Sequence, residues 1–183
     1  MPHLTPLWLR YYRELAALTE PAGRGTSSWA PMWSRGRTCI LETDFAYMIG
    51  PDPFARLVVP FVTACCAELD HGFYHLDGKG QIPHLDQLLA IPGLKGVQWI
   101  PGSGQPEAAD PMWWPLLKRI RDAGKLVQFY SPGDLVLRMA REVPLTGFAI
   151  ETWAGNPGDQ ANLVEAIQRE NAALRARTTV TAT

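Results

Sequence analysis

The stretch Gly72-Phe73-Tyr74-His75-Leu76-Asp77-Gly78 joins a short apolar run to two polar side chains and a closing glycine. The apolar, aromatic residues over 72–75 predict a β-strand. Residues two apart on a strand point to the same side. We therefore expect His75 and Asp77 to reach into one shared space where the strand gives way to a loop. An imidazole and a carboxylate that converge at a strand end are typical of a proton-transfer or metal site.

Strand-like and helix-like segments alternate along most of the chain. The predicted strands cover 38–41, 72–75, 96–100, 126–130 and 147–150, and the predicted helices cover 7–18, 53–70, 82–90, 111–123, 133–142 and 160–175. Regular alternation of this kind indicates βαβ units and a parallel sheet. The continuous apolar strands suit a sheet that is buried on both faces. We therefore expect an α/β fold.

The length of the chain limits how much of such a fold it can build. A complete eight-stranded barrel typically needs about 250 residues, and this chain has 183. We expect about five parallel strands, either as a partial (β/α)8 TIM barrel or as an open sheet of the same units. The predicted organisation is an N-terminal helix and loop over 1–36, the barrel-like part over 37–177 and a tail over 178–183.

Composition and charge exclude several classes of partner. The net charge is −1 and the pI is about 6.4, so nothing electrostatic favours nucleic acid or an acidic membrane. Cys39, Cys65 and Cys66 form a poor disulfide framework and lack the spacing of a metal knuckle. The sequence shows no signal-peptide pattern and no segment apolar enough to span a bilayer. We therefore expect a cytoplasmic protein.

Several short motifs follow one another between Leu41 and Trp99, and one more follows. They are Thr43-Asp44-Phe45, Gly50-Pro51-Asp52-Pro53-Phe54, Val59-Pro60, Tyr74-His75-Leu76-Asp77-Gly78, His84-Leu85-Asp86, Gly96-Val97-Gln98-Trp99 and Ala123-Gly124-Lys125. In order and spacing, the set resembles the C-terminal half of the uroporphyrinogen decarboxylase superfamily. This superfamily also includes cobalamin-dependent methyltransferases that act on thiols. The resemblance implies a barrel with its pocket at the carboxyl ends of the strands, and it implies that the N-terminal strands are absent from this chain.

The two branches of that superfamily imply different chemistry. The decarboxylase branch holds a tetrapyrrole with groups from its N-terminal half, which has no counterpart in this sequence. The methyltransferase branch binds zinc through His-x-Cys on one strand and a cysteine near the last strand. By resemblance, His75 matches the histidine, Asp77 stands where the first cysteine would be, and the last-strand position falls near Glu151 or Thr152.

The strand ends supply the candidate site residues. Candidates for catalysis are Asp44, His75 and Asp77, and candidates for substrate binding are Gln98, Trp99, Tyr130 and Trp153. His75, Asp77 and Glu151 offer one nitrogen and two oxygens, a set that suits zinc with an open position or a harder ion. An alternative without function is that the aspartates precede turns for backbone reasons. The adjacent Cys65 and Cys66 are predicted to be inert core residues.

Three functions remain open at this point. The first is a uroporphyrinogen decarboxylase-like enzyme acting on a tetrapyrrole-type acid, with His75 as proton donor and Asp44 stabilising the cationic intermediate. The second is a corrinoid-linked methyltransferase. The third is a truncated chain without activity of its own. The expected partner is accordingly a tetrapyrrole, a corrinoid or a thiol, and the open sheet edge of a half barrel favours a homo-oligomer or association with the missing N-terminal half-barrel.

Overall fold

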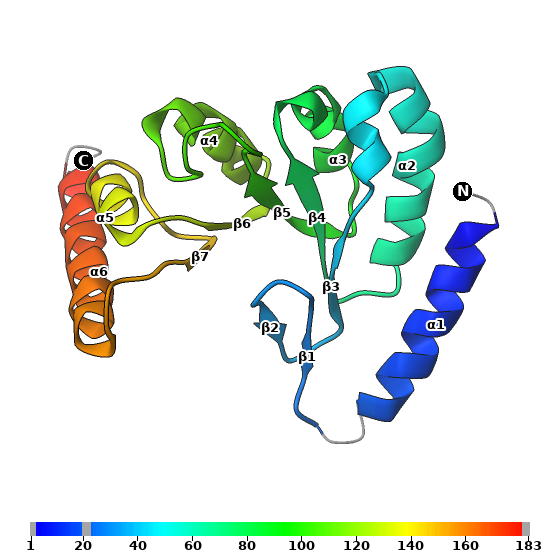
Figure 1. Cartoon of the computed structure of the whole chain (residues 1–183), viewed down its shortest axis with the longest axis horizontal. Coiled ribbons are helices and arrows are strands. Elements are labelled where there is room, and N and C mark those ends of the chain that lie inside the picture. Colours follow the sequence, from blue (N-terminus) through cyan, green and yellow to red (C-terminus); the bar gives the residue numbers. More distant parts are fainter. Residues whose placement is uncertain (1–2, 20–22, 181–183) are drawn as a thin grey trace.

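The structure is a computed structural model that describes residues 3–19 and 23–180 (Figure 1). The strands are β1 (Thr26–Ser27), β2 (Trp33–Ser34), β3 (Thr38–Leu41), β4 (His71–Asp77), β5 (Leu94–Ile100), β6 (Leu126–Tyr130) and β7 (Phe148–Glu151). The α-helices are α1 (Leu4–Thr19), α2 (Pro51–Cys66), α3 (Leu85–Leu89), α4 (Trp114–Asp122), α5 (Gly133–Glu142) and α6 (Pro157–Val180). The 3₁₀-helices η2 (Asp44–Met48), η3 (Lys79–His84) and η4 (Pro111–Trp113) precede α2, α3 and α4. The predicted strands and helices are confirmed, with shifts at their ends.

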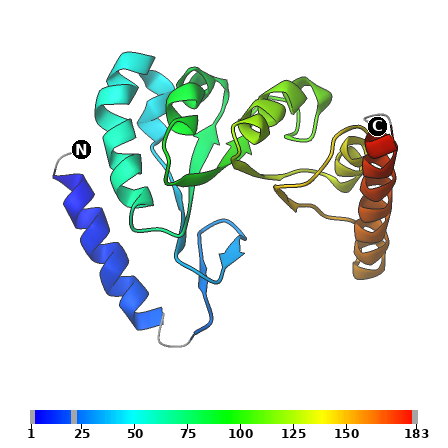
Figure 2. The same cartoon turned by 180° about the vertical axis from the view of Figure 1, so that it is seen from behind.

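Strands β3 to β7 form one parallel sheet in the order of the chain. One α-helix connects each strand to the next, and both views show α2, α3 and α4 on the same side of the sheet (Figures 1 and 2). Sequential order with helices on one face is the arrangement in a (β/α)8 barrel, whereas a doubly wound sheet reverses its order and carries helices on both faces. The fold is therefore α/β, and its sheet corresponds to part of a TIM barrel that does not close.

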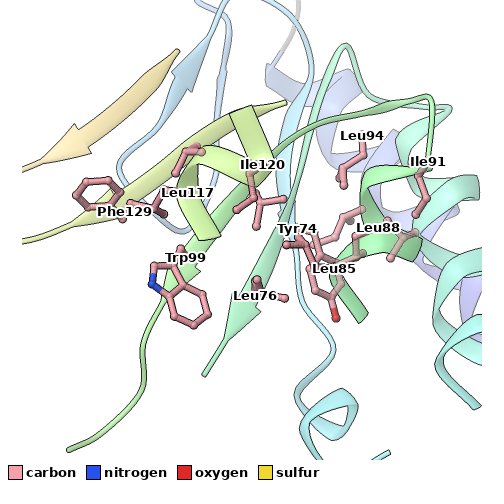
Figure 3. Packing of buried hydrophobic residues seen from close by; sticks show 14 of the residues in the cluster. Tyr74, Leu76, Leu85, Leu88, Ile91, Leu94, Trp99, Leu117, Ile120 and Phe129 are labelled. Atoms are coloured by element: carbon pink, nitrogen blue, oxygen red, sulfur yellow. The ribbon is translucent and has the colours of Figure 1, made fainter. Parts of the chain in front are cut away.

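The face of the sheet under the helices carries the hydrophobic core. From the strands, this core contains Tyr74, Leu76, Val97, Trp99, Val127 and Phe129, and from the helices Phe54, Val58, Leu85, Leu88, Leu117, Ile120, Val136 and Met139 (Figure 3). The strand members alternate along β4, β5 and β6, as side chains on one face of a sheet must. Local sequence signals set where these helices begin and end. Pro51 and Pro53 lie in the first turn of α2, and Gly124 follows α4 with a φ of 76°.

The opposite face of the sheet, which we call the open face, is covered only in part. Near β3 and β4, Ala30 packs against Ile40 and Phe73. Toward β6 and β7 this face is more exposed, since Leu126 is 38% exposed and Glu151 is exposed, although Gln128 on β6 is buried. The expectation that both faces are buried is therefore confirmed along β4 and β5 and wrong toward β7.

The first helix packs outside the sheet on α2. Trp8 stacks on Tyr12 with 5.0 Å between ring centroids and meets Phe61 edge-on. Arg13 pairs with Glu68 at the surface beyond the end of α2. A surface ion pair contributes little, so the aromatic contacts hold α1 in place.

The last helix packs on α5. The Asn171 side chain donates to the carbonyl oxygens of Ala140 and Val143 and accepts from the Leu145 amide, which satisfies backbone groups at the end of α5. The tail predicted over 178–183 is helical as far as residue 180 and otherwise lies outside the described residues. None of the helices in the described ranges has the length and apolar character needed to cross a membrane.

Candidate active site at the carboxyl ends of the strands

A buried polar row crosses the open face of the sheet. His75 on β4 lies in register with Gln98 on β5, which lies in register with Gln128 on β6. All three are buried, with His75 8% exposed. The Nδ1 atom of His75 is 2.5 Å from the Gln98 Oε1 atom. With the amide oxygen as acceptor, Nδ1 carries the proton and Nε2 keeps its lone pair when the ring is neutral.

Trp29 covers His75 from the loop between β1 and β2. The two rings meet edge-on with 5.2 Å between centroids. The Trp29 Nε1–H group donates to the Ile40 carbonyl oxygen at 3.0 Å, which fixes the indole against β3. Because this indole is 57% exposed, part of its surface remains available beside His75.

Three carboxyl groups gather near His75. Glu42 directly follows β3, Asp44 begins η2 and Asp77 ends β4. Partial burial of its carboxyl group raises the pKa of Glu42, although the residue as a whole is exposed, and a hydrogen bond with Asp44 raises it further. The negative charge of Asp77 acts in the same direction, and His75 opposes it. Glu42 and Asp44 therefore form a carboxyl pair that favours a shared proton.

Two hollows open beside Asp77 at the same strand ends. One, of about 330 Å³, is lined by Tyr47, Asp77, Lys79 and residues of the loop over 101–105. The other, of about 380 Å³, is lined by Asp77, Tyr130, Glu107 and the same loop. In this loop Gly102 and Gly104 have φ angles of 90° and 73°, a conformation that glycine adopts without steric cost. A polar ligand that occupies these hollows would meet carboxylates, a lysine and a phenol.

The predicted catalytic residues are thus neighbours. Asp44 and Asp77 both act on Glu42, and His75 lies within electrostatic reach of the same carboxyl group. Of the predicted binding residues, Tyr130 lines the larger hollow, and Gln98 is buried beneath the site as the partner of His75. Trp153 follows β7, is half exposed, and does not line either hollow.

Trp99 does not lie at the site. The prediction that it binds substrate is wrong, because it points to the helix-covered face, is fully buried and meets Trp113 edge-on at 5.0 Å (Figure 3). The reason is strand alternation. Gln98 faces His75 across the open face, so its immediate neighbour must face the helices.

The predicted metal site does not form. Within residues 3–19 and 23–180, no three His, Cys, Asp or Glu side chains lie close enough together to hold a metal ion. His75 and Asp77 lie on β4, and Glu151 lies on β7, three strands away. Neighbouring strands are about 4.8 Å apart, so these positions are separated by roughly 14 Å along the sheet. The set of His75, Asp77 and Glu151 therefore does not assemble into a zinc site.

The cysteines lie away from the strand ends. Cys65 and Cys66 belong to the core beneath α2, which confirms them as core residues, and Cys39 packs against the same core. Burial raises the pKa of Cys65 to about 12 and that of Cys66 to about 11. Both side chains therefore remain protonated thiols at neutral pH, and neither can serve as a nucleophile or metal ligand at the strand ends.

A larger cavity lies elsewhere, between α4 and the segment that joins α5 to β7. It measures about 770 Å³ and is lined by apolar groups such as Trp114, Pro144 and Phe148. Of the charged groups at its margin, Lys118 pairs with Asp122, Arg121 donates to the Lys125 carbonyl oxygen, and Glu142 is a further carboxylate. None of the residues predicted for catalysis lines this cavity.

Sequence reasoning missed two residues of the site and gave a third no specific role. Trp29 lies in a stretch rich in glycine, serine and tryptophan that was interpreted as a loop, and only its fold-back places it on His75. Gln128 is buried, and its Oε1 atom has no hydrogen-bond partner in the described part of the chain. Glu42 directly follows β3, and its hydrogen bond with Asp44 depends on the backbone turn into η2.

The comparisons with known proteins returned no match. No protein-family model fits the sequence, and neither the curated proteins nor the solved structures include a significant match.

Proposed function

We propose that this chain is an enzyme that performs acid–base chemistry at the carboxyl ends of its strands, and that its substrate is a tetrapyrrole-type acid that it decarboxylates. The observation that carries the proposal is the carboxyl pair of Glu42 and Asp44 beside His75 and Asp77. A raised carboxyl pKa extends to higher pH the range over which Glu42 holds a proton that it can donate. The resemblance of the Thr43-Asp44-Phe45 and Tyr74-His75-Leu76-Asp77-Gly78 motifs to uroporphyrinogen decarboxylases supports the choice of substrate.

The chemistry of an acetate arm on a pyrrole ring matches this set of groups. A proton added to the ring carbon next to the one that bears the arm creates a cation that extends onto the arm-bearing carbon. The electrons of the bond to the carboxylate then form a double bond between the exocyclic carbon and the arm-bearing carbon, and CO₂ leaves. The exocyclic carbon takes a proton from solvent to become a methyl group, and the protonated ring carbon gives up its own proton. The net reaction consumes one proton for each CO₂ released.

Each neighbouring side chain has a part in this proposal. Glu42 supplies the proton that it shares with Asp44. Asp44 and Asp77 then face the cation as carboxylates, and negative charge fixed in place stabilises a cationic intermediate. The unprotonated Nε2 atom of His75 accepts the ring proton. Trp29 and Tyr130 offer aromatic surfaces on which a flat ring can lie.

Corrinoid-linked methyl transfer has less support. That reaction is expected to use a zinc-bound thiolate, and Cys39, Cys65 and Cys66 lie at the helix-covered core rather than at the strand ends. Among residues 3–19 and 23–180, no cysteine lies at the strand ends to supply the sulfur ligand that Asp77 replaces in the motif.

The test is an anaerobic assay with a porphyrinogen that carries acetate arms, read as CO₂ release and as the number of carboxylates left on the product. We expect turnover by the wild-type chain and a loss of at least a hundredfold in Glu42→Gln and Asp44→Asn, the usual range for a positioned acid or stabilising charge. Glu151→Gln is the matched control, since it alters a strand-end carboxylate on β7. No product from the wild-type chain, or unchanged turnover in both site variants, would contradict the proposal.

A further inference from the structure

The two outer strands of the sheet differ in how their free edges are treated. An edge strand exposes backbone N–H and C=O groups that can pair with another chain. The His71 amide donates to the Arg37 carbonyl, so Arg37, Cys39 and Leu41 direct their backbone groups toward β4. By alternation, Thr38 and Ile40 direct theirs toward the free edge of β3.

All four of those edge groups are bonded to side chains of the N-terminal segment. The Thr38 amide donates to Thr26 Oγ1 at 2.8 Å, and the Tyr12 hydroxyl donates to the Thr38 carbonyl at 3.3 Å. The Ile40 amide donates to the Ser28 hydroxyl at 2.9 Å, and Trp29 donates to the Ile40 carbonyl at 3.0 Å. Side chains, rather than a neighbouring strand, therefore satisfy the backbone hydrogen-bonding groups at the free edge of β3.

The segment that supplies these side chains is itself held in place. Thr26 Oγ1 also donates to the Gly36 carbonyl at 2.7 Å, and the short pairing of β1 with β2 closes the turn that carries Ser28 and Trp29. Figure 1 shows β1 and β2 beside the lower part of β3. Ala30 from the same turn is buried against Ile40. Both polar and apolar contacts thus fasten the segment to the edge.

The β7 edge has no comparable cover. The amides of Val127 and Ser131 donate to the Gly147 and Glu151 carbonyls, so Ile150 directs its backbone groups away from β6. No side chain in the described part of the chain bonds to the Ile150 backbone. The sealing of β3 is therefore a specific feature and not a general property of the sheet ends.

We propose that residues 23–34, together with Tyr12, form an edge seal that occupies the place of a neighbouring strand at β3 and prevents this strand from pairing with a second copy of the chain. The second copy is the partner that β3 fits. The strand itself is uncharged over Thr38–Leu41, and Arg37 and Glu42 bracket it. An antiparallel copy would bring those opposite charges near each other. A strand from an added N-terminal half-barrel would likewise have to displace the four hydrogen bonds of the seal.

The test compares the double variant Thr26→Val/Ser28→Ala with the wild-type chain. Valine keeps the shape of threonine, so the change removes two hydroxyl groups and little volume. Amide exchange, measured by NMR on dilute protein, is expected to become about tenfold faster at Thr38 and Ile40, because each amide loses its only acceptor. Sedimentation at rising concentration is expected to show a dimer for the variant and a monomer for the wild type.

Two controls separate the seal from general damage. Thr26→Ser/Ser28→Thr retains both hydroxyl groups and is expected to behave as wild type. Ser27→Ala removes the intervening hydroxyl, which donates to the Ser28 carbonyl oxygen instead of bonding to an edge group of β3, and is also expected to have no effect. Unchanged exchange at Thr38 and Ile40 in a folded double variant would overturn the seal. Faster exchange without any dimer would overturn the second copy as the partner that the seal excludes. Neither measurement depends on enzymatic activity.

Discussion

The two faces of the β3–β7 sheet are made from the same strands but have different roles. The face under the helices is a continuous apolar core that includes Trp99 and Leu88. The open face carries a buried polar row and opens to solvent near β7. Stability therefore resides mainly in the helix-covered face, while the open face is free to carry polar groups. Each of the following changes tests that division.

The largest effect is expected from removing core volume on the helix-covered face. Leu88 on α3 is fully buried, whereas Leu126 on the open face is 38% exposed. We expect Leu88→Ala to lower the free energy of unfolding by about 3 kcal/mol, since burial is lost and a cavity remains. Leu126→Ala is expected to cost less than about 1 kcal/mol. Denaturant unfolding measures both, and equal losses would mean that the open face contributes to the core.

A smaller effect is expected from the polar row, where two glutamines provide a matched pair. Gln98→Leu leaves the buried His75 Nδ1 group without its partner, and we expect a loss of about 1–3 kcal/mol in the free energy of unfolding. Gln128→Leu removes an amide whose Oε1 atom has no partner in the described residues. This second change is expected to be neutral or stabilising. If Gln128→Leu costs as much as Gln98→Leu, Gln128 has a partner that we have not identified.

The smallest effect concerns pH and the carboxyl groups at the strand ends. The pKa of Glu42 is raised in the folded chain, so its contribution to stability is fully present below the ordinary carboxyl pKa and is lost as pH rises through the raised value. Glu42→Gln imitates the protonated form. We therefore expect the variant to be slightly more stable than wild type at neutral pH and to lose that advantage in acid.

Glu68 supplies a control of opposite sign for this measurement. A hydrogen bond from Arg13 lowers the pKa of Glu68, so its contribution is present above the ordinary carboxyl pKa and is lost as pH falls through the lowered value. Glu68→Gln should therefore be slightly less stable than wild type at neutral pH and equal to it in strong acid. Unfolding measured between acid and neutral pH tests both slopes. A pH-independent difference for Glu42→Gln would contradict the shared proton.

Much of the fold was predictable because its signals are local. The apolar runs that became β3 to β7 and the helical segments between them can be read from periodicity. The expectation that His75 and Asp77 share a space follows from the two-residue repeat of a strand. The side of the sheet that Trp99 faces was not predictable in the same way. It depends on which residues of β4 and β5 pair with each other.

The parallel α/β architecture and the polar residues at the strand ends follow from the sequence alone, since each depends on chain-local patterns. Which of those residues meet depends on tertiary contacts. Strand register places Gln98 beside His75 and turns Trp99 away. The fold-back of the N-terminal segment brings Trp29 to His75 and closes the β3 edge. These contacts join residues far apart in the chain, and their free energy arises from packing and hydrogen bonds that no local pattern encodes.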